Sequence, residues 1–397
     1  MKHERTLIAA LSGVQFCHIL DFMIMMPLAP LLMREFAISA AEFGLLLSAY
    51  SYTSAGTAIF AAGSVDRFER RRLLLGLFAL FVLLTLASAL AGRYATLLLA
   101  RAASGAVGGL LGALVYTIVG EAIPFERRGR AAGTIMAAFS LATVAGVPVA
   151  LTFSNLWSWR AAFLFIAAFS FAFFALALWA LPVLAAHPER REEHHLATLW
   201  QVLCDDAHWR ALVLMAALVF AAFLVVPFIP VHLTSHVGLR QSELPIVYFV
   251  GGLATLITSR LIGALADRHG KQRVLRLVAT AALLPLLALT HLPSATLPVA
   301  LAVTTAFFIL VPGRMPPAMA LTTQAADPAR RGAFMAVNGA AMSLASGSAA
   351  IVSGLIAAPA GGALIHYDRV GWLAAAINVF AIIWVGRLRL RSNPGYP

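Results

Sequence analysis

The sequence predicts an all-α polytopic membrane protein in which twelve transmembrane helices form two pseudo-symmetric six-helix bundles around a central cavity. Three observations predict this fold class: a low content of charged residues, long apolar stretches that recur, and landmarks that repeat about 200 residues apart. Hydrophobic residues make up 61% of the 397 residues and charged residues only 12%. Soluble proteins carry about 25% charged residues, so this chain has too few of them to cover a water-facing surface.

Apolar stretches long enough to cross a hydrocarbon core of about 30 Å recur from one end of the chain to the other. Closed β-barrels are excluded because the stretches are too long for strands and show no alternation of period two. The predicted helices span residues 6–33, 42–65, 73–91, 95–120, 131–155, 160–183, 210–235, 243–266, 274–291, 296–321, 333–357 and 370–388.

Lysine and arginine residues set the predicted orientation. Of the 29, 21 lie in the termini and the even-numbered connections, five lie in the odd-numbered connections, and three fall inside spans. The positive-inside rule then places both termini in the cytoplasm, as for a multi-pass protein of a bacterial-type inner (plasma) membrane. Because the net charge of +12 is explained by this topology, no nucleic-acid partner is predicted.

The N-terminal segment, MKHERTLIAALSGVQF, has a charged start but no small-residue cleavage site after a short apolar core. We therefore expect it to form a retained first helix. Cys17 falls inside this helix and Cys204 falls in a polar segment, so the two cysteines indicate no disulfide framework.

The polar segment 184–209 divides the spans into bundles at 1–183 and 210–397. Its apolar residues Leu196, Leu199, Trp200 and Leu203 have helical spacing, which predicts a short amphipathic helix on the inner membrane face. The alternative is a plain linker with a few apolar residues. The REEHH run at 191–195 could hold a metal, but a solvated charge run explains it better, and no metal site is predicted.

The two halves carry the same landmarks at nearly constant offsets. MMPLAP at 25–30 repeats as VVPFIP at 225–230, AGSVDRFERRR at 62–72 aligns with GALADRHGKQR at 263–273, and FERRG at 125–129 aligns with PARRG at 328–332. A duplicated unit of six spans enters the membrane from the same side twice, so its copies are related by an axis along the membrane normal. Transporters whose halves rock about a site between them have this arrangement.

The motifs resemble those of the major facilitator superfamily, and more narrowly its twelve-helix proton-coupled efflux branch for drugs or sugars. The loop after the eighth span fits the G-x-x-x-D-R-x-G-basic signature of that family through Gly263, Asp267, Arg268, Gly270 and Lys271. The resemblance extends over essentially the whole chain.

The first copy of this loop keeps Asp66 and Arg67 but has Ala62 and Glu69 where the family usually has glycine. The fourth span carries RAASG, which is similar to the R-x-x-x-G motif of the family and begins at Arg101.

The fifth span carries GVPVA, with Gly146, Pro148 and Ala150, followed by WSWRAAF. This resembles the glycine-proline motif of exporters in the family, with Ala150 in place of a usual glycine, and it favours export.

The resemblance implies a cytoplasmic gate. An aspartate in such a loop can lie against a helix N-terminus or pair with an arginine, and contacts that form in one state and break in the other bias the equilibrium between states. The alternative is that the arginines only set topology and bind anionic lipid. The gate residues implied are Asp66, Arg67, Glu121, Arg130, Gly263, Asp267, Arg268 and Gly270.

No motif indicates a cofactor or an enzyme. HGKQ is not part of a phosphate-binding loop, because Gln272 follows the lysine where Ser or Thr is needed. The glycines of GAVGGLLG lie inside a membrane span, where small residues allow close packing. A membrane-embedded enzyme or a receptor would need a catalytic constellation or a large polar domain, and the longest polar segment has only about 26 residues.

Asp21 is a carboxylate inside the apolar run LDFMIMMPLAP. An ionised acid that faces lipid costs about 2.5–3.5 kcal/mol on insertion scales, so we expect Asp21 to face the central cavity, where water or a partner stabilises it. Gln15 and His18 extend the same polar stripe at spacings of three. The equivalent position in the second half is Ala221, so the acid belongs to one copy only. Prolines after it are expected to bend the outer end of the helix.

Arg101 is the candidate partner of Asp21. If Asp21 alternates between water and a drier setting as the halves rock, its affinity for a proton changes with the state. Protons then enter from the periplasm, and substrate that competes for the cavity leaves. His18 either shares the proton or only forms a hydrogen bond. The alternative reading of the pair is a static ion pair that joins the first and fourth spans.

Further polar residues in the spans are candidates for contact with substrate. Among them, Arg314 could neutralise an anionic substrate or extend outward to the interface. The candidates are Gln15, Tyr50, Tyr52, Thr53, Thr143, Tyr248, Arg314, Asn338 and Ser343.

The sequence thus predicts a proton-driven exporter of small organic molecules, with protons, substrate and the lipid bilayer as partners and a monomer as the working unit. The alternative is a facilitator or proton-coupled importer of the same fold in which Asp21 is structural. The substrate stays open, because drug, sugar and metabolite exporters share these motifs.

Overall fold

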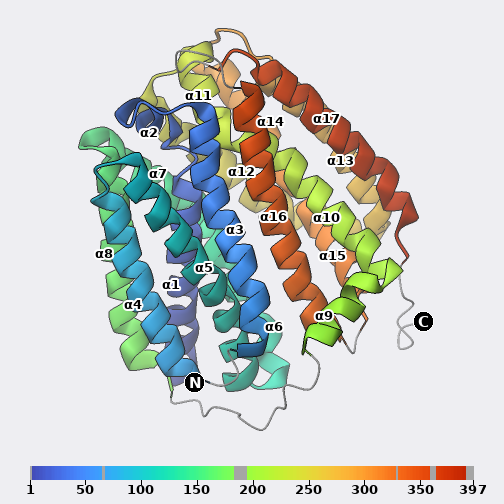
Figure 1. Ribbon diagram of the computed structural model, residues 1–397. Coiled ribbons are helices and arrows are strands. Elements are labelled where there is room, and N and C mark those ends of the chain that lie inside the picture. The colour runs from blue at the N-terminus through green and yellow to red at the C-terminus, as the bar shows by residue number, and fades with distance from the viewer. Residues whose placement is uncertain (1, 65–67, 183–194, 328–329, 358–363, 390–397) are drawn as a thin grey trace.

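The computed structural model describes residues 2–64, 68–182, 195–327, 330–357 and 364–389 (Figure 1). These residues form helices joined by short connections. In the first half the helices are α1 (Lys2–Ile24), α2 (Ala29–Glu35), α3 (Ala40–Ser64), α4 (Arg70–Ala89), α5 (Tyr94–Ala122), α6 (Phe125–Leu141), the π-helical turn η2 (Ala142–Gly146), α7 (Val147–Leu156) and α8 (Trp159–Ala180).

The second half begins with an additional helix and contains more short turns than the first. Its helices are α9 (His195–Cys204), α10 (Asp206–Val225), η3 (Val226–Phe228), α11 (Ile229–His232), η4 (Leu233–Val237), η5 (Gln241–Glu243), α12 (Leu244–His269), α13 (Lys271–Thr290), α14 (Leu297–Gly313), α15 (Met315–Ala325), α16 (Arg331–Ala357), α17 (Tyr367–Trp384) and η7 (Val385–Arg387).

The predicted fold class is confirmed. Among the described residues, eleven helical segments are long and apolar enough to cross a membrane. The predicted span 42–65 corresponds to α3, which has 25 residues but carries a run of Ser, Thr and Tyr residues that makes it less apolar. Those polar residues contact neighbouring helices, as described below.

The prolines break the spans at matching places in the two halves. Before Pro27 and Pro30, α1 ends at Ile24 and a turn leads into α2, so the predicted bend is confirmed. Before Pro227 and Pro230, α10 ends and the 3₁₀ turn η3 leads into α11. Proline lacks the N–H that an α-helix needs and collides with the preceding turn, so the same break appears in both copies.

The predicted continuous helix at 296–321 is wrong in one respect. Pro312 lies in the last turn of α14, which ends at Gly313, and α15 starts at Met315. The two pieces meet at Arg314. The sequence analysis missed that a buried arginine would stand at this break.

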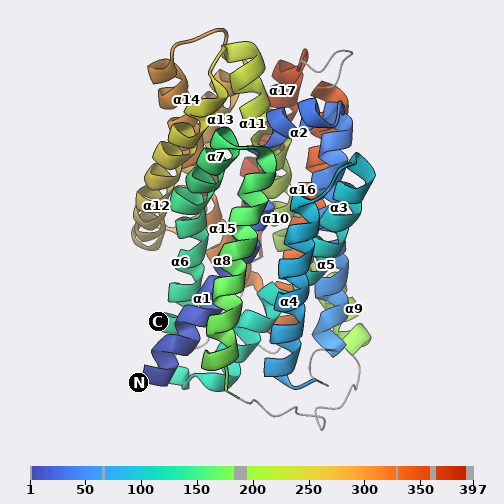
Figure 2. The ribbon, with the colours of Figure 1, turned by 90° about the vertical axis from the view of Figure 1, so that its left-hand side faces the viewer.

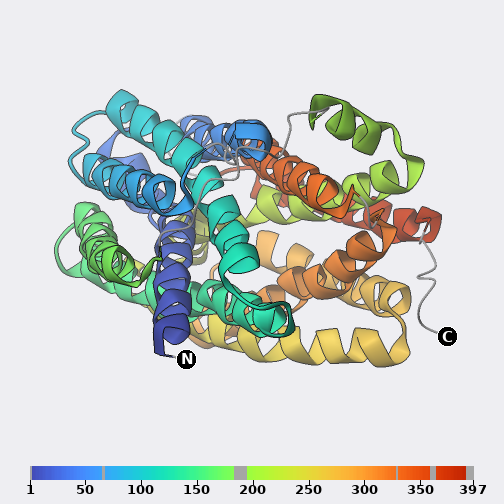
Figure 3. The same ribbon diagram turned by 90° about the horizontal axis from the view of Figure 1, so that it is seen from below.

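In Figures 1 and 2 α1 starts at the lower end of the molecule, and in Figure 1 α17 runs downward from the top to its end on the right. The end of each bundle at which these helices start or finish is here called the terminal end. Figure 3, seen from that end, shows the helices of the two halves gathered on opposite sides. Helix α3 packs along α16, and α7 with η2 packs against α12. These helix pairs form the boundary between the bundles.

The predicted helix in the central linker is confirmed as α9, His195–Cys204. Its Val202 is buried in an apolar cluster with Leu212 and Phe334, while Trp200 is 68% exposed. The helix thus packs on the second bundle with one face and presents an apolar side chain on another. The side chains of Leu196 and Leu199, and the REEHH run up to residue 194, lie outside the described part of the chain.

Candidate functional site

Asp21 and Arg101 form a buried ion pair between α1 and α5. Arg101 Nη1 donates to Asp21 Oδ2 at 2.7 Å, and Arg101 Nη2 donates to the backbone oxygen of Asp21 at 3.2 Å. The Asp21 side chain is 0% exposed and that of Arg101 is 1% exposed. The two residues stand 80 positions apart in the chain. The structure therefore brings together the two groups that the sequence selected.

Tyr50 of α3 completes this cluster. The guanidinium carbon of Arg101 lies 4.7 Å from the centre of the Tyr50 ring, so the cation is stabilised by an aromatic face as well as by a carboxylate. The rings of His18 and Tyr50 are 6.5 Å apart. The cluster therefore draws side chains from α1, α3 and α5.

Several polar atoms around the pair are buried and have no hydrogen-bond partner among the residues that the structure describes. They are Gln15 Oε1, His18 Nδ1, Asp21 Oδ1, Tyr50 Oη and Arg101 Nε. A buried polar atom left unpaired costs about 1–3 kcal/mol, and such groups gather where a site has a function besides stability. The cluster thus has unused capacity to bind a proton, water or a polar ligand.

Two glycines of α5 allow this close packing. A Cβ at Gly108 would lie 2.5 Å from Tyr50 Oη and 2.7 Å from His18 Cδ2, and a Cβ at Gly105 would lie 2.2 Å from the backbone oxygen of Tyr50. All three distances are shorter than a real Cβ tolerates. The glycine of the R-x-x-x-G motif is therefore explained by the contact of α5 with α3, one turn away from Arg101.

The prediction that Asp21 faces a water-reachable cavity is wrong for this conformation, because Asp21 is fully buried. The ion pair supplies the reason: the charge of Arg101 compensates the carboxylate where water is excluded. A buried carboxylate without such a partner would be far less favourable.

The other candidates on α3 join helices. Thr53 Oγ1 donates to the backbone oxygen of Ala102 at 2.7 Å, and Tyr50 is 4% exposed. Thr53 thus joins α3 to α5, and substrate contact by Tyr50 and Thr53 stays a prediction. Tyr52 Oη lies 3.0 Å from Ser348 Oγ, so it connects α3 of the first bundle with α16 of the second.

Tyr248 and Asn338 retain unpaired polar atoms. Tyr248 on α12 is 6% exposed and Asn338 on α16 is 1% exposed, and neither Tyr248 Oη nor Asn338 Oδ1 has a partner. Thr143 donates to the backbone oxygen of Phe139 at 2.9 Å, and the backbone oxygen of Ser343 accepts from Ser346 at 2.9 Å. Tyr248 and Asn338 are thus the stronger candidates of this group.

Arg314 neither extends outward nor lies open to substrate in this structure, so both alternatives from the sequence are wrong for this conformation. It is 0% exposed. Its Nη1 donates to Asn378 Oδ1 of α17, and its Nε donates to the backbone oxygen of Val311 at 2.9 Å. Its Nη2 donates to the backbone oxygen of Leu218 on α10 at 3.4 Å. The break between α14 and α15 points this side chain into the second bundle.

This arrangement parallels Arg101 with one difference. Each arginine donates to a backbone oxygen on the first long helix of its own bundle, Asp21 in α1 and Leu218 in α10. In the first bundle the side-chain partner is a carboxylate, and in the second it is the amide of Asn378. We call each arginine with its side-chain partner a clamp: Arg101 with Asp21 in the first bundle and Arg314 with Asn378 in the second. Only the first clamp can take up a proton at its acceptor.

Replacing Asn378 with leucine is expected to destabilise the second bundle. Hydrogen bonds to a charged group contribute about 1.5–3 kcal/mol, so we expect a loss of about 2 kcal/mol and a lower melting temperature of the detergent-purified protein. Asn378→Asp retains an acceptor and is the control. Equal melting temperatures of Asn378→Leu and the unmodified protein would contradict a stabilising role of the Arg314–Asn378 hydrogen bond.

The gate residues of the first bundle are partly described. Arg70 Nε lies 3.1 Å from Glu121 Oε1, with the Arg70 side chain 2% and the Glu121 side chain 25% exposed. This pair joins α4 to the end of α5. Arg130 is exposed. Asp66 and Arg67 lie outside the described residues.

The gate residues of the second bundle make no ion pair with another described residue. Asp267 and Arg268 are exposed at the end of α12. Gly270 has φ of 91°, a left-handed conformation that favours glycine, and it lets α12 turn directly into α13. A Cβ at Gly263 would meet only Pro316 Cβ at 4.0 Å, so no steric reason requires glycine there.

The helix-5 motif forms a break in the helix. A π-helical turn ends at Gly146, and Pro148 follows in the first turn of α7. A Cβ at Gly146 would lie 3.0 Å from Leu20 Cδ1 and 3.1 Å from Phe16 Cζ, so the glycine lets α1 approach closely. Ala150 is 0% exposed, and the methyl group that replaces the usual glycine is accommodated in the core.

Sequence reasoning missed Asn378 as a partner of Arg314 and Arg70 as the partner of Glu121. A polar amide inside an apolar span was the available signal for Asn378. For Arg70, the signal was its place in the loop motif after the second span, from which Asp66 and Arg67 were selected instead.

Known proteins resemble this chain in sequence and in fold. The profile described as Major Facilitator Superfamily matches residues 11–346. A chloramphenicol efflux pump of Mycobacterium tuberculosis is 29% identical over 61% of this chain and 58% of its own length. A probable sugar efflux transporter of Helicobacter pylori is 25% identical over 60% of each chain. The matches thus span somewhat more than half the length of these relatives.

Among solved structures, a bacterial homologue of the human lysosomal transporter Spinster, in an inward-facing and occupied conformation, superposes with a TM-score of 0.77. It is 16% identical and covers 100% of both chains, a similarity that shows the fold alone. With the family profile matching most of its length, this chain belongs to the major facilitator superfamily.

Proposed function

We propose that this chain exports small organic molecules by proton antiport, as a monomer in a bacterial-type inner membrane with both termini in the cytoplasm. The family supports membrane transport of small molecules. Export, and a drug-like, sugar or metabolite substrate, are supported by relatives named as chloramphenicol and sugar efflux proteins and by the Gly146–Ala150 motif.

The observation that carries the proposal is the Asp21–Arg101 pair, which is fully buried and surrounded by unpaired polar atoms. A purely structural clamp needs no titratable acceptor, as the arginine–amide pair of the second bundle demonstrates. The first bundle alone has a carboxylate at the clamp. Acidic residues inside membrane spans mark proton pathways more often than other positions do.

The proposed coupling acts through the charge of Asp21. A proton on this carboxylate cancels its charge and leaves Arg101 as a buried cation without a counter-ion, which is strongly unfavourable. The protonated protein therefore favours a conformation that hydrates Arg101. Deprotonation on the cytoplasmic side restores the ion pair. Because each state of Asp21 stabilises one conformation, the proton gradient biases the direction of rocking.

Hydrogen bonds between the bundles are consistent with one closed state of such a cycle. Between described residues, four side-chain hydrogen bonds cross the boundary: Ser48 to Gly347, Tyr52 with Ser348, Ser346 to Ser51, and Asn155 to Gln241. They lie near the middle of α3 and α16 or, for Asn155 and Gln241, at the end opposite the terminal end. In the proposed orientation this opposite end is periplasmic, so the structure corresponds to a state closed toward the periplasm.

A facilitator or proton-coupled importer with a static Asp21 is the second candidate. It is favoured by the resemblance of the two clamps, since Arg314 joins helices of its bundle without any titratable acceptor. In this reading the Asp21–Arg101 pair only joins α1 to α5.

The test is transport by purified protein in liposomes with an imposed pH gradient, using a panel that includes chloramphenicol and sugars. Antiport predicts that at least one compound accumulates on the acidic side and that accumulation stops when the gradient is collapsed. Movement that only equalises concentrations, or accumulation on the alkaline side, would favour the second candidate.

A further inference from the structure

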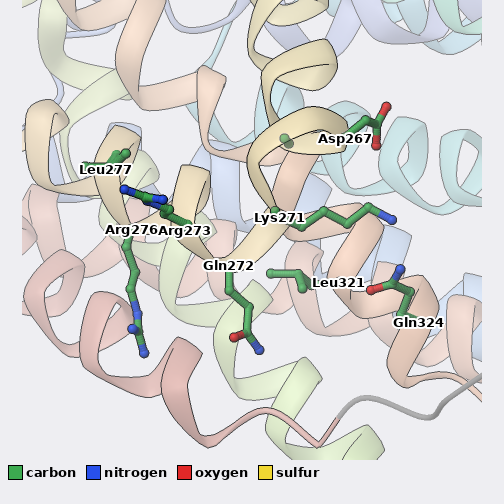
Figure 4. Close-up of a pocket in the computed structure, with 10 residues that line it drawn as sticks. Asp267, Lys271, Gln272, Arg273, Arg276, Leu277, Leu321 and Gln324 are labelled. Atoms are coloured by element: carbon green, nitrogen blue, oxygen red, sulfur yellow. The ribbon is translucent and has the colours of Figure 1, made fainter.

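A basic pocket opens at the terminal end of the second bundle, where α12 turns into α13. Its volume is about 770 Å³, and its lining includes Lys271, Arg273 and Arg276 from the first turns of α13. Two amides, Gln272 and Gln324, also line it. Figure 4 shows these residues projecting from the start of α13 and from α15.

The three cations of this pocket form no ion pair and no side-chain hydrogen bond with any part of the chain that the structure describes. Other arginines at the same end of the molecule do: Arg127 Nη1 lies 2.6 Å from Glu4 Oε2, and Arg210 Nε lies 3.0 Å from Asp206 Oδ1. The pocket has one acid, Asp267, and Figure 4 shows it on the side away from Arg276. A net positive charge in a pocket is suited to an anion.

Arg276 is held in place by the neighbouring helix. A Cβ at Gly386 would lie only 2.5 Å from Arg276 Nη2. The guanidinium therefore lies against the backbone of η7, and this contact is possible because residue 386 is glycine. Positioned guanidinium groups recognise phosphate oxygens through two parallel hydrogen bonds.

An exposed apolar track leads from the pocket toward the middle of the bundle. Leu277, which lines the pocket, is 62% exposed, and Leu284, two turns further on the same face of α13, is 78% exposed. On the adjacent α17, Ile383 is 62% exposed. In a membrane these side chains contact acyl chains. A soluble anion has no apolar part that would contact these side chains.

We propose that this pocket binds the phosphate group of an anionic phospholipid, with its acyl chains lying along Leu277 and Leu284. Arg273 and Arg276 hold the phosphate, and Lys271 adds a third positive charge. All lining residues belong to α12, α13, α15 and the connecting Gly270 of one bundle, so rocking of the bundles does not dismantle the site. The assignment is independent of the direction and coupling of transport.

The test is native mass spectrometry of the full-length, detergent-purified protein titrated with phosphatidylglycerol. Phosphatidylcholine with the same acyl chains tests the need for net negative charge, and inorganic phosphate tests the need for a lipid. The variant is Arg273→Gln with Arg276→Gln. The matched control is Arg330→Gln with Arg331→Gln, which removes equal charge from the same bundle outside the pocket.

The proposal expects saturable binding of phosphatidylglycerol that exceeds binding of phosphatidylcholine. A basic residue near an anionic lipid surface contributes about fivefold to affinity, so the pocket variant is expected to bind phosphatidylglycerol about tenfold or more weakly. The control variant is expected to bind it like the unmodified protein. Millimolar inorganic phosphate is expected to leave the bound lipid in place.

Three outcomes would overturn the assignment: equal binding of the two lipids, an equal loss of binding in both variants, or displacement of the lipid by inorganic phosphate. The last would make this a site for soluble phosphate. Melting temperatures of both variants establish that they are folded, so weak binding cannot be a consequence of unfolding.

Discussion

Replacing Asp21 with asparagine is expected to abolish proton-driven accumulation of substrate while downhill exchange continues. The amide keeps the shape of the carboxylate and an acceptor for Arg101 Nη1, which Asp21 contacts at 2.7 Å, but it cannot exchange a proton. The variant therefore reproduces the arginine–amide clamp of the second bundle. Accumulation in liposomes with an imposed pH gradient is expected to fall to the level of protein-free liposomes.

Asp368→Asn is the control for this prediction, because Asp368 lies at the start of α17, away from the cluster, and the substitution removes the same charge. Its accumulation is expected to equal that of the unmodified protein. Concentrative transport that persists in Asp21→Asn would eliminate the coupling role and leave the static ion pair. Loss of downhill exchange as well would indicate a structural role instead.

Replacing Gly354 with valine is expected to keep the bundles from closing at the end opposite the termini. A Cβ at Gly354 would lie 2.5 Å from the backbone oxygen of Ala40 and 2.9 Å from the Cα of Ala41. These are backbone atoms of α3, so no side-chain rotation relieves the collision. We expect transport to fall by at least about tenfold, because one state of the cycle is lost.

The measurement is the distance between spin labels placed on α3 and α16 at that end, which is expected to increase in Gly354→Val. The matched control is Gly339→Val on the same helix, because a Cβ at Gly339 would meet no atom within 4 Å. Similar distances in Gly354→Val and the unmodified protein would contradict the role of this contact in closure. A large loss of transport in Gly339→Val would show that any β-branched residue in α16 is harmful.

The same boundary explains Tyr52, which sequence reasoning assigned to substrate and which contacts Ser348 of α16. Serine and tyrosine residues on α3 form hydrogen bonds to α16, for example Ser48 Oγ to the backbone oxygen of Gly347 at 2.7 Å. A polar residue inside a span has several uses, and the choice between a substrate contact and a helix contact depends on the rotation of the helix. Periodicity alone did not give that rotation.

Asp21 illustrates both the strength and the limit of the sequence. A lone acid in an apolar run was enough to select it, and the matching motif in the fourth span was enough to select Arg101. That the carboxylate would be sealed from water followed only from the packing, because Tyr50 and two glycine contacts of α5 close around the pair. Asn378 was overlooked for the same reason, since its partner stands 64 positions earlier in the chain.

The sequence by itself determined that this chain crosses a membrane many times, that its helices form two related bundles, and that prolines interrupt them at matching places. These properties follow from local composition and from repetition along the chain. The length of an apolar stretch determines whether that stretch can span a membrane, and the missing N–H of a proline interrupts the helix in which it occurs. The tertiary structure alone decided that the Asp21–Arg101 pair is sealed from water, that Arg314 meets Asn378, and which face of α3 contacts α16. Such contacts join residues as far apart as 299 positions, and they depend on how closely helix backbones approach at glycine.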